Sequence, residues 1–171
     1  MKERQGFQTA VWGPTAWVFL HSITFSYPDK PDAETRAQFF NFFKSMMYVL
    51  PCKYCRDSYA SYCKSSGPLG LKMKRFESRA TLTKWLYDIH DAVNLKLDKK
   101  DRPTFPEVKA IYKEFKASCT TKENERSKGC VAPNGKNGIR LKSAIRIIPR
   151  ECVLKGKTLK IYRKCLERYD I

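Results

Sequence analysis

Two cysteines separated by two residues, Cys52 and Cys55, are the feature of this chain best suited to chemistry. A two-residue spacer lets one turn of helix hold both thiols close enough to form an exchangeable disulfide. Pro51 favours a helix start, which places Cys52 in the first turn, where unpaired N–H groups and the helix dipole favour a thiolate. The spacing therefore predicts a catalytic dithiol that exchanges disulfides.

The only two histidines of the chain lie on either side of this pair, each in an aromatic, amphipathic segment. Trp17 and His21 recur at helical spacing upstream, and His90 and Asn94 share one edge of a helix expected downstream. Indole and imidazole faces along an apolar slot suit a planar aromatic cofactor. The lysines that follow and could meet its phosphates are Lys96 and Lys99.

Hydrophobic periodicity and capping residues predict five helices. They cover residues 13–26, 33–50, 51–65 and 81–99, and a short fifth helix follows Thr104. Pro14 suits the first turn of the first helix, Asp32 can cap the second, and Thr104 with Glu107 forms a capping box for the fifth. The second helix is apolar over a wide arc, as expected of a mostly buried helix.

No strand alternation and no glycine-rich phosphate loop appears in this half of the chain. The predicted fold class is therefore all-α, with a helical domain over residues 1–118 and a basic extension over residues 119–171. The extension carries more of the net charge of +17 than the longer first part. Such charge implies contact with nucleic acid or an acidic protein, unless the surface is simply solvated.

The N-terminus has no signal-peptide pattern and no apolar run approaches the length of a membrane span, so a cytoplasmic location is expected. Seven cysteines in a chain of this kind favour catalysis or metal binding over structural disulfides. Zinc would need two ligands beyond Cys52 and Cys55. Cys63 and His90 are available, but neither a second CxxC nor an HxxxH pattern exists, so no metal is predicted.

Three separate motifs resemble the Erv/ALR family of FAD-linked sulfhydryl oxidases over about residues 12–116. They are Trp12-Gly13-Pro14-x-x-Trp17-x-x-Leu20-His21, Pro51-Cys52-x-x-Cys55 and Trp85-Leu86-x-x-x-His90-x-x-Val93-Asn94-x-x-Leu97. The resemblance implies a four-helix bundle with a short fifth helix, bound FAD and a homodimer. It also implies an enzyme that oxidises protein dithiols to disulfides and passes the electrons to oxygen, giving hydrogen peroxide.

The resemblance also implies roles for individual residues. Cys55 corresponds to the thiol that faces the flavin C4a position, and Cys52 to the interchange thiol that meets the substrate. The residues that correspond to FAD contacts are Gly13, Trp17, His21, His90, Val93, Asn94, Lys96, Lys99 and, from the fifth helix, Tyr112.

Three positions depart from the family pattern. Asp91 stands where many members have Asn, Asp98 replaces the usual Gly, and Glu107 occupies the place of a structural cysteine. The missing cysteine, the Trp-Gly-Pro opening and the Leu50-Pro51-Cys52 junction resemble the viral branch found in large cytoplasmic DNA viruses. Such an enzyme would form disulfides for virion proteins within a reducing host cytoplasm, or in the virion itself.

The extension does not match the family core, and its four cysteines leave alternatives open. Cys119 with Cys130, or Cys152 with Cys165, could form a shuttle disulfide that relays electrons to Cys52, and the first pair is slightly favoured because flexible surroundings are expected for it. They could equally form a stabilising disulfide or remain free. The alternative function is a helical zinc- or thiol-containing binding module whose basic tail binds nucleic acid.

Overall fold

The computed structural model describes residues 6–118 and 132–133. The chain divides into two units, Met1–Leu141 and Lys142–Ile171, and every described residue lies in the first. The favoured shuttle cysteines, Cys119 and Cys130, and the rest of the extension lie outside the described residues. The domain boundary after residue 118 therefore stays a prediction.

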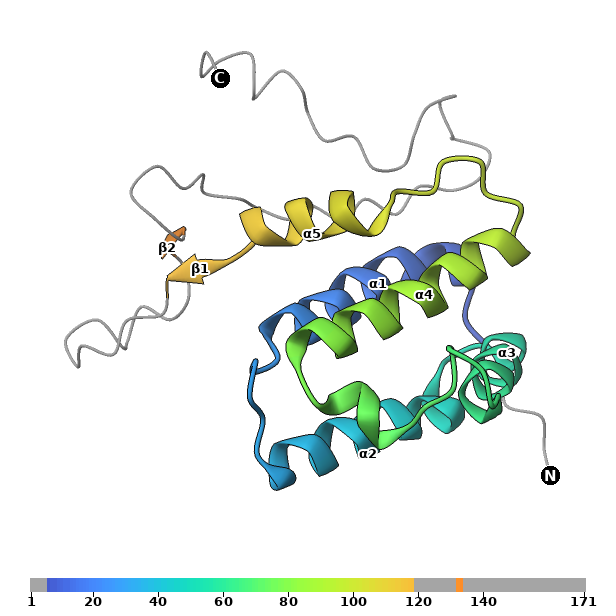
Figure 1. Ribbon diagram of the computed structural model, residues 1–171. Helices are drawn as coiled ribbons and strands as arrows, with labels where there is room; N and C mark the ends of the chain where they lie inside the picture. The colour runs from blue at the N-terminus through green and yellow to red at the C-terminus, as the bar shows by residue number, and fades with distance from the viewer. Residues whose placement is uncertain (1–5, 119–131, 134–171) are drawn as a thin grey trace, which may run out of the picture. The chain divides into compact units, whose positions relative to one another are not determined.

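The described part of the chain is a helical bundle, as the sequence predicted (Figure 1). Its elements are α1 (Thr9–Ser26), α2 (Ala33–Val49), α3 (Lys53–Lys64), the 3-10 helix η1 (Met73–Phe76), α4 (Arg79–Lys96) and α5 (Phe105–Glu114). Helices α1 and α4 lie side by side, α2 packs with α3, η1 contacts α2 and α4, and α5 packs on α1. The predicted four-helix bundle with a short fifth helix is confirmed.

One element was not predicted, a short antiparallel pairing of β1 (Ala117–Ser118) with β2 (Ala132–Pro133). Ala117 is opposite Pro133 and Ser118 is opposite Ala132. Two-residue strands carry almost no periodicity, so hydrophobic alternation could not reveal them.

Local capping residues set several helix ends. The Asp32 carboxylate accepts a hydrogen bond from the Thr35 N–H at 2.6 Å, and Glu107 accepts one from the Thr104 N–H at 2.6 Å. These two predicted caps are confirmed. Ser78, which was not identified as a cap, accepts a bond from the Thr81 N–H at 3.2 Å and starts α4. Side-chain acceptors of this kind satisfy N–H groups that lack partners in the helix.

The predicted start of α1 and the predicted end of α4 are wrong. Helix α1 begins at Thr9, so Pro14 lies inside the helix rather than in its first turn. Pro14 removes the bond to the Ala10 carbonyl, and both residues are exposed, which leaves that carbonyl open to water. Helix α4 ends at Lys96 rather than Lys99, because Asp98 adopts φ 51°, a left-handed conformation that cannot continue the helix.

The core lies where α2, α4 and η1 meet, around the fully buried rings of Phe43, Phe76 and Trp85. Buried polar groups within it are paired with backbone carbonyls: the Trp85 indole N–H donates to Leu69, and the Tyr27 hydroxyl donates to Phe76. Such pairing removes the cost of burying a polar group.

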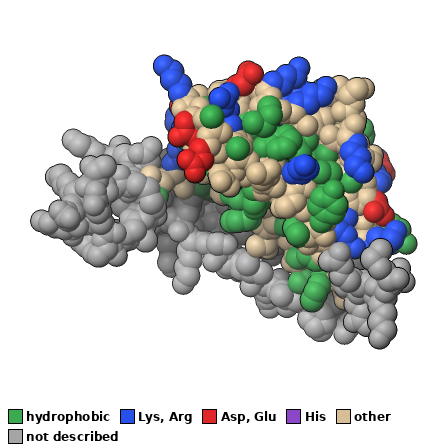
Figure 2. Space-filling model, turned by 90° about the horizontal axis from the view of Figure 1, so that it is seen from below, with side chains coloured by type: hydrophobic (Ala, Val, Ile, Leu, Met, Phe, Trp, Pro, Cys, Tyr) green, Lys and Arg blue, Asp and Glu red, His purple; other side chains and the backbone are tan. Residues whose placement is uncertain are grey.

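Helix α2 is less buried than its apolar arc predicted. Only Phe43 and Met46 are buried, whereas Phe42, Tyr48 and Val49 are exposed, because the bundle covers one side of the helix. Figure 2 views the molecule from the side of α2 and shows hydrophobic side chains spread across this face among Lys and Arg. No helix in the described ranges is long and apolar enough to cross a membrane.

Candidate functional site

The two cysteines lie at the start of α3, both reduced and both partly buried. Cys52 is the N-cap of the helix, and its Sγ accepts a hydrogen bond from the Cys55 N–H at 3.3 Å. The prediction that Cys52 lies in the first turn is therefore wrong, because Pro51 and Cys52 both precede the helix. The helix start can still favour a thiolate at Cys52, since a capping sulfur receives the unpaired N–H groups directly.

The two thiols differ in acidity. Burial alone would raise the pKa of Cys52, but hydrogen bonds from the Cys55 thiol and N–H, the Thr9 hydroxyl and the Tyr54 N–H outweigh it and lower the pKa. Burial raises the pKa of Cys55, and the hydrogen bond between the two thiols raises it further. Cys52 is therefore the thiol that ionises first.

One row of α1 side chains runs from the cysteines along the helix towards α5. Its members recur every four residues and are Thr9, Gly13, Trp17, His21 and Phe25. At the first end, Thr9 Oγ1 lies 3.8 Å from Cys55 Sγ. At the other end, the rings of Phe25 and Tyr112 stack with centroids 4.8 Å apart and planes 2° apart. The row therefore joins the dithiol to an aromatic cluster.

The aromatic cluster is built from α1, α4 and α5. Trp17 stacks on His90 with centroids 3.9 Å apart and planes 7° apart. His21 Nε2 and His90 Nδ1 share a hydrogen bond of 3.0 Å, and the Tyr112 ring lies 5.3 Å from the His21 ring. The structure thus brings together four residues that the sequence placed at a cofactor site.

Both histidines are neutral near pH 7. Burial lowers the pKa of His21 to about 4. Burial lowers the pKa of His90 to about 3, with smaller contributions from the positive charges of His21 and Lys99. His21 Nδ1 is buried and has no hydrogen-bond partner among the described residues. A buried polar atom without a partner is costly, so this nitrogen is suited to receiving a ligand.

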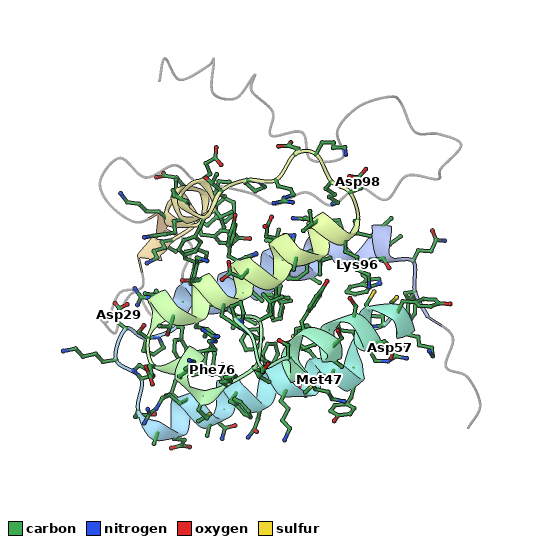
Figure 3. All side chains as sticks on the ribbon, turned by 45° about the vertical axis from the view of Figure 1, so that its right-hand side comes forward. Asp29, Met47, Asp57, Phe76, Lys96 and Asp98 are labelled. Atoms are coloured by element: carbon green, nitrogen blue, oxygen red, sulfur yellow. The ribbon has the colours of Figure 1, made fainter. Side chains whose placement is uncertain are left out.

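The remaining predicted cofactor residues lie on and beyond the last turn of α4. Asn94 is buried and Val93 is partly buried. Lys96 Nζ donates to Ser58 Oγ at 3.1 Å and so links α4 to α3 (Figure 3). The Lys99 N–H donates to the Asn94 carbonyl at 3.0 Å, while the Lys99 side chain is exposed.

The three departures from the family pattern each have a structural role. Asp91 forms a two-point ion pair with Arg102, with distances of 2.9 Å to Nε and 3.2 Å to Nη2, which ties α4 to the segment before α5. Asp98 makes a left-handed turn at the position where the family pattern has Gly. Glu107 caps α5.

Sequence reasoning missed Thr9, Ser58 and Arg102, whose partners are 46, 38 and 11 residues away. The four-residue row of α1 was the one signal for Thr9, and the wrong helix start at residue 13 concealed it. A hollow of about 290 Å³ between α2 and α3 touches none of the predicted site residues; Met47 and Asp57, labelled in Figure 3, are part of its lining. No group of three or more His, Cys, Asp or Glu in residues 6–118 and 132–133 could hold a metal ion.

The chain is similar to known proteins over this helical part. The model of the Erv1 / Alr family matches residues 14–116. The probable FAD-linked sulfhydryl oxidase R368 of Acanthamoeba polyphaga mimivirus is 40% identical over 103 residues, which are 60% of this chain and 69% of that protein. The mitochondrial FAD-linked sulfhydryl oxidase ERV1 of Saccharomyces cerevisiae is 30% identical over 87 residues, 51% of this chain and 43% of that protein.

A solved structure agrees with the fold. The FAD-binding domain of Erv1 from Saccharomyces cerevisiae superposes with a TM-score of 0.55 at 24% identity, covering 62% of this chain and 94% of that domain. At this identity the likeness shows the fold alone.

Proposed function

Because the chain belongs to the Erv1/Alr family, we propose that it is a flavin-dependent thiol oxidase that forms disulfides in protein substrates through Cys52 and Cys55. FAD, when bound, would accept the electron pair of the dithiol and pass that pair on to oxygen, giving hydrogen peroxide. The observation that carries the proposal is the α1 row that joins the dithiol, at Thr9, to the aromatic cluster, at Trp17 and His21.

The residues of the cluster fit a flavin dinucleotide. Trp17 and His90 offer flat aromatic faces, His21 Nδ1 lacks a hydrogen-bond partner among the described residues, and the Lys99 side chain is exposed for a phosphate. Lys96 would exchange its bond to Ser58 for one to the cofactor. The residues proposed to hold FAD are Gly13, Trp17, His21, His90, Val93, Asn94, Lys96, Lys99 and Tyr112.

Cys52 is proposed to exchange with the substrate. When the pair is oxidised, a substrate thiolate attacks Cys52 Sγ, the bond between Cys52 and Cys55 breaks, and Cys55 leaves as a thiolate. The second substrate thiol, once deprotonated, attacks the substrate sulfur and releases Cys52 as a thiolate. The lowered pKa of Cys52 favours this second departure, and the more buried Cys55 is the thiol proposed to face the flavin.

A second copy of the chain is the partner proposed for the exposed apolar faces of α1 and α2. Val18 and Phe19 of α1 are 45% and 58% exposed, and Phe42 and Val49 of α2 are 37% and 66% exposed. Phe42 and Val49 are seven residues apart and so lie on the same side of α2. Val18 and Phe19 are adjacent exposed positions of α1, so both helices can contribute to a packing surface. Burying such a surface in a homodimer removes apolar area from water.

The basic extension is proposed to serve substrates rather than the cofactor. Cys119 comes directly after Ser118 of β1, and Cys130 comes two residues before Ala132 of β2. Because Ser118 and Ala132 are paired, chain connectivity favours these two cysteines as the shuttle disulfide. The positive charge of the extension suits an acidic protein or nucleic acid. Since several named relatives are viral, the host cytoplasm or the virion is the proposed location.

Purification tests the function directly. We expect a yellow protein that releases FAD on denaturation, consumes oxygen with dithiothreitol and forms hydrogen peroxide. Cys52→Ser and Cys55→Ser should abolish steady turnover, whereas Cys63→Ala should not, because Cys63 is buried on the same helix and burial raises its pKa to about 11. A colourless protein with stoichiometric zinc would refute the proposal in favour of a binding module.

A further inference from the structure

Thr9 contacts the dithiol through its hydroxyl, which acts on the pKa of both Cys52 and Cys55. Its Oγ1 lies 3.8 Å from Cys55 Sγ, and the same hydroxyl acts to lower the pKa of Cys52. Thr9 precedes the segment that the family model matches, residues 14–116. We propose that the Thr9 hydroxyl is a positioning group that donates to whichever sulfur of the pair carries negative charge, and so sets how oxidising the Cys52–Cys55 disulfide is.

Backbone contacts hold the start of α1 against the dithiol. The Phe7 N–H donates to the Pro51 carbonyl at 3.2 Å, and the Trp12 indole N–H donates to the Phe7 carbonyl at 3.2 Å. A Cβ added to Gly6 would lie 3.1 Å from the Pro51 carbonyl oxygen, so glycine permits this close approach. The segment before α1 is therefore fixed beside Cys52.

The other side of Thr9 is fixed by Gly13. A Cβ added to Gly13 would lie 3.3 Å from the Thr9 methyl group, so that methyl packs closely over the glycine. Because threonine is β-branched and stiff at χ1, fixing its methyl also fixes its hydroxyl. The packing therefore holds the hydroxyl at the dithiol.

The electrostatics of the pair agree with this geometry. The hydrogen bond from Thr9 acts to lower the pKa of both Cys52 and Cys55, against the effect of burial. Arg56 is the cation that acts on Cys55 in the same direction. Since one hydroxyl carries one proton, Thr9 serves one sulfur at a time.

The step in which this matters is thiol exchange, and here the inference rests on the proposed function. As the substrate sulfur bonds to Cys52, the electron pair of the Cys52–Cys55 bond passes to Cys55 Sγ. Thr9 then donates to the new Cys55 thiolate. When the substrate departs as a disulfide and Cys52 becomes the thiolate, the same hydroxyl donates to Cys52.

The test compares Thr9→Val, which removes the hydroxyl and keeps the shape, with Thr9→Ser, which keeps the hydroxyl. Thr15→Val is the matched control, because Thr15 is an exposed threonine of the same helix. The fully reduced proteins are alkylated with iodoacetamide across a pH series, and Cys52 is followed by mass spectrometry. Trypsin separates the three described cysteines, because Cys52 falls in residues 45–53, Cys55 in 54–56 and Cys63 in 57–64.

Thr9→Val should raise the pH midpoint of Cys52 alkylation by about one unit, the worth of one hydrogen bond to a charged group. Its disulfide, equilibrated with glutathione, should be correspondingly less oxidising. Thr9→Ser and Thr15→Val should retain the wild-type midpoint and potential. An unchanged midpoint in a folded Thr9→Val protein, or Thr9→Ser that behaves like Thr9→Val, would overturn the proposal.

A backbone variant keeps the test decisive if Thr9→Val fails to fold. Phe7→Pro removes the N–H that bonds to the Pro51 carbonyl, whereas Phe7→Ala keeps it. Phe7→Pro should raise the Cys52 midpoint and Phe7→Ala should not, and equal midpoints would contradict the account. Alkylation does not need flavin, so a colourless wild-type protein would refute the proposed oxidase and leave this comparison valid.

Discussion

Between pH 7 and pH 5, where carboxylates scarcely titrate, acid should destabilise this protein through His21 and His90. An unfolded histidine has a pKa near 6.5, whereas burial lowers the pKa of His21 to about 4 and that of His90 to about 3. The unfolded state therefore binds more protons than the folded state below pH 6.5. This contribution to stability is complete above pH 6.5 and is lost as the pH falls towards the folded pKa values.

The size of the loss follows from linkage. Between pH 7 and pH 5 each histidine should remove about 2 kcal/mol, and the pair about 4 kcal/mol, a large share of the stability of an ordinary domain. This loss of stability depends little on the pKa values of the two histidines in the folded state, because both values lie well below 5. The chain has only two histidines, so no other imidazole contributes.

Urea unfolding at several pH values measures this loss. His90→Phe keeps a ring that can stack on Trp17 and should leave only the His21 share, about 2 kcal/mol between pH 7 and pH 5. A variant with both His21→Phe and His90→Phe should show almost no dependence in this range. Wild-type stability that stays flat from pH 7 to pH 5 would refute the buried, neutral histidine pair.

Further expectations concern the dithiol, a turn, the extension and the dimer. Cys52→Ser should leave Cys55 as an unpaired thiolate beside the flavin and give a long-wavelength charge-transfer band, and a band only in Cys55→Ser would reverse the two roles. Asp98→Gly should raise the free energy of unfolding by about 0.5–1 kcal/mol in urea melts, because glycine adopts φ 51° without strain. Cys119→Ala with Cys130→Ala should slow oxidation of protein substrates but not of dithiothreitol, and normal protein oxidation would exclude this shuttle pair. Phe19→Asp should give a monomer by light scattering, whereas a persistent dimer would place the interface elsewhere.

Short-range chemistry made much of the fold predictable. Asp32 bonds to Thr35 and Glu107 to Thr104, contacts three residues apart that the sequence displays directly. Pro14 misled the same reasoning, because a proline suited to a first turn also fits an exposed helix interior whose carbonyl water can reach.

The site was predictable only in part, because its contacts join distant segments. The motifs singled out Trp17, His21 and His90, and the structure places them in contact. The four-residue spacing places Thr9 in line with Trp17, but it could not show that Thr9 would reach Cys55, because folding of α1 against α3 creates that contact.

The passage of electrons from the dithiol through Cys55 to the flavin can be followed by anaerobic titration of the purified protein with dithiothreitol, with the visible absorbance of the flavin as the readout. Wild-type flavin should bleach after two electron pairs enter, one for the Cys52–Cys55 disulfide and one for the flavin. Cys55→Ser, with its flavin still bound, should stay yellow on the same timescale. Equal bleaching of wild type and Cys55→Ser, or a wild-type protein that binds no flavin, would refute this electron route.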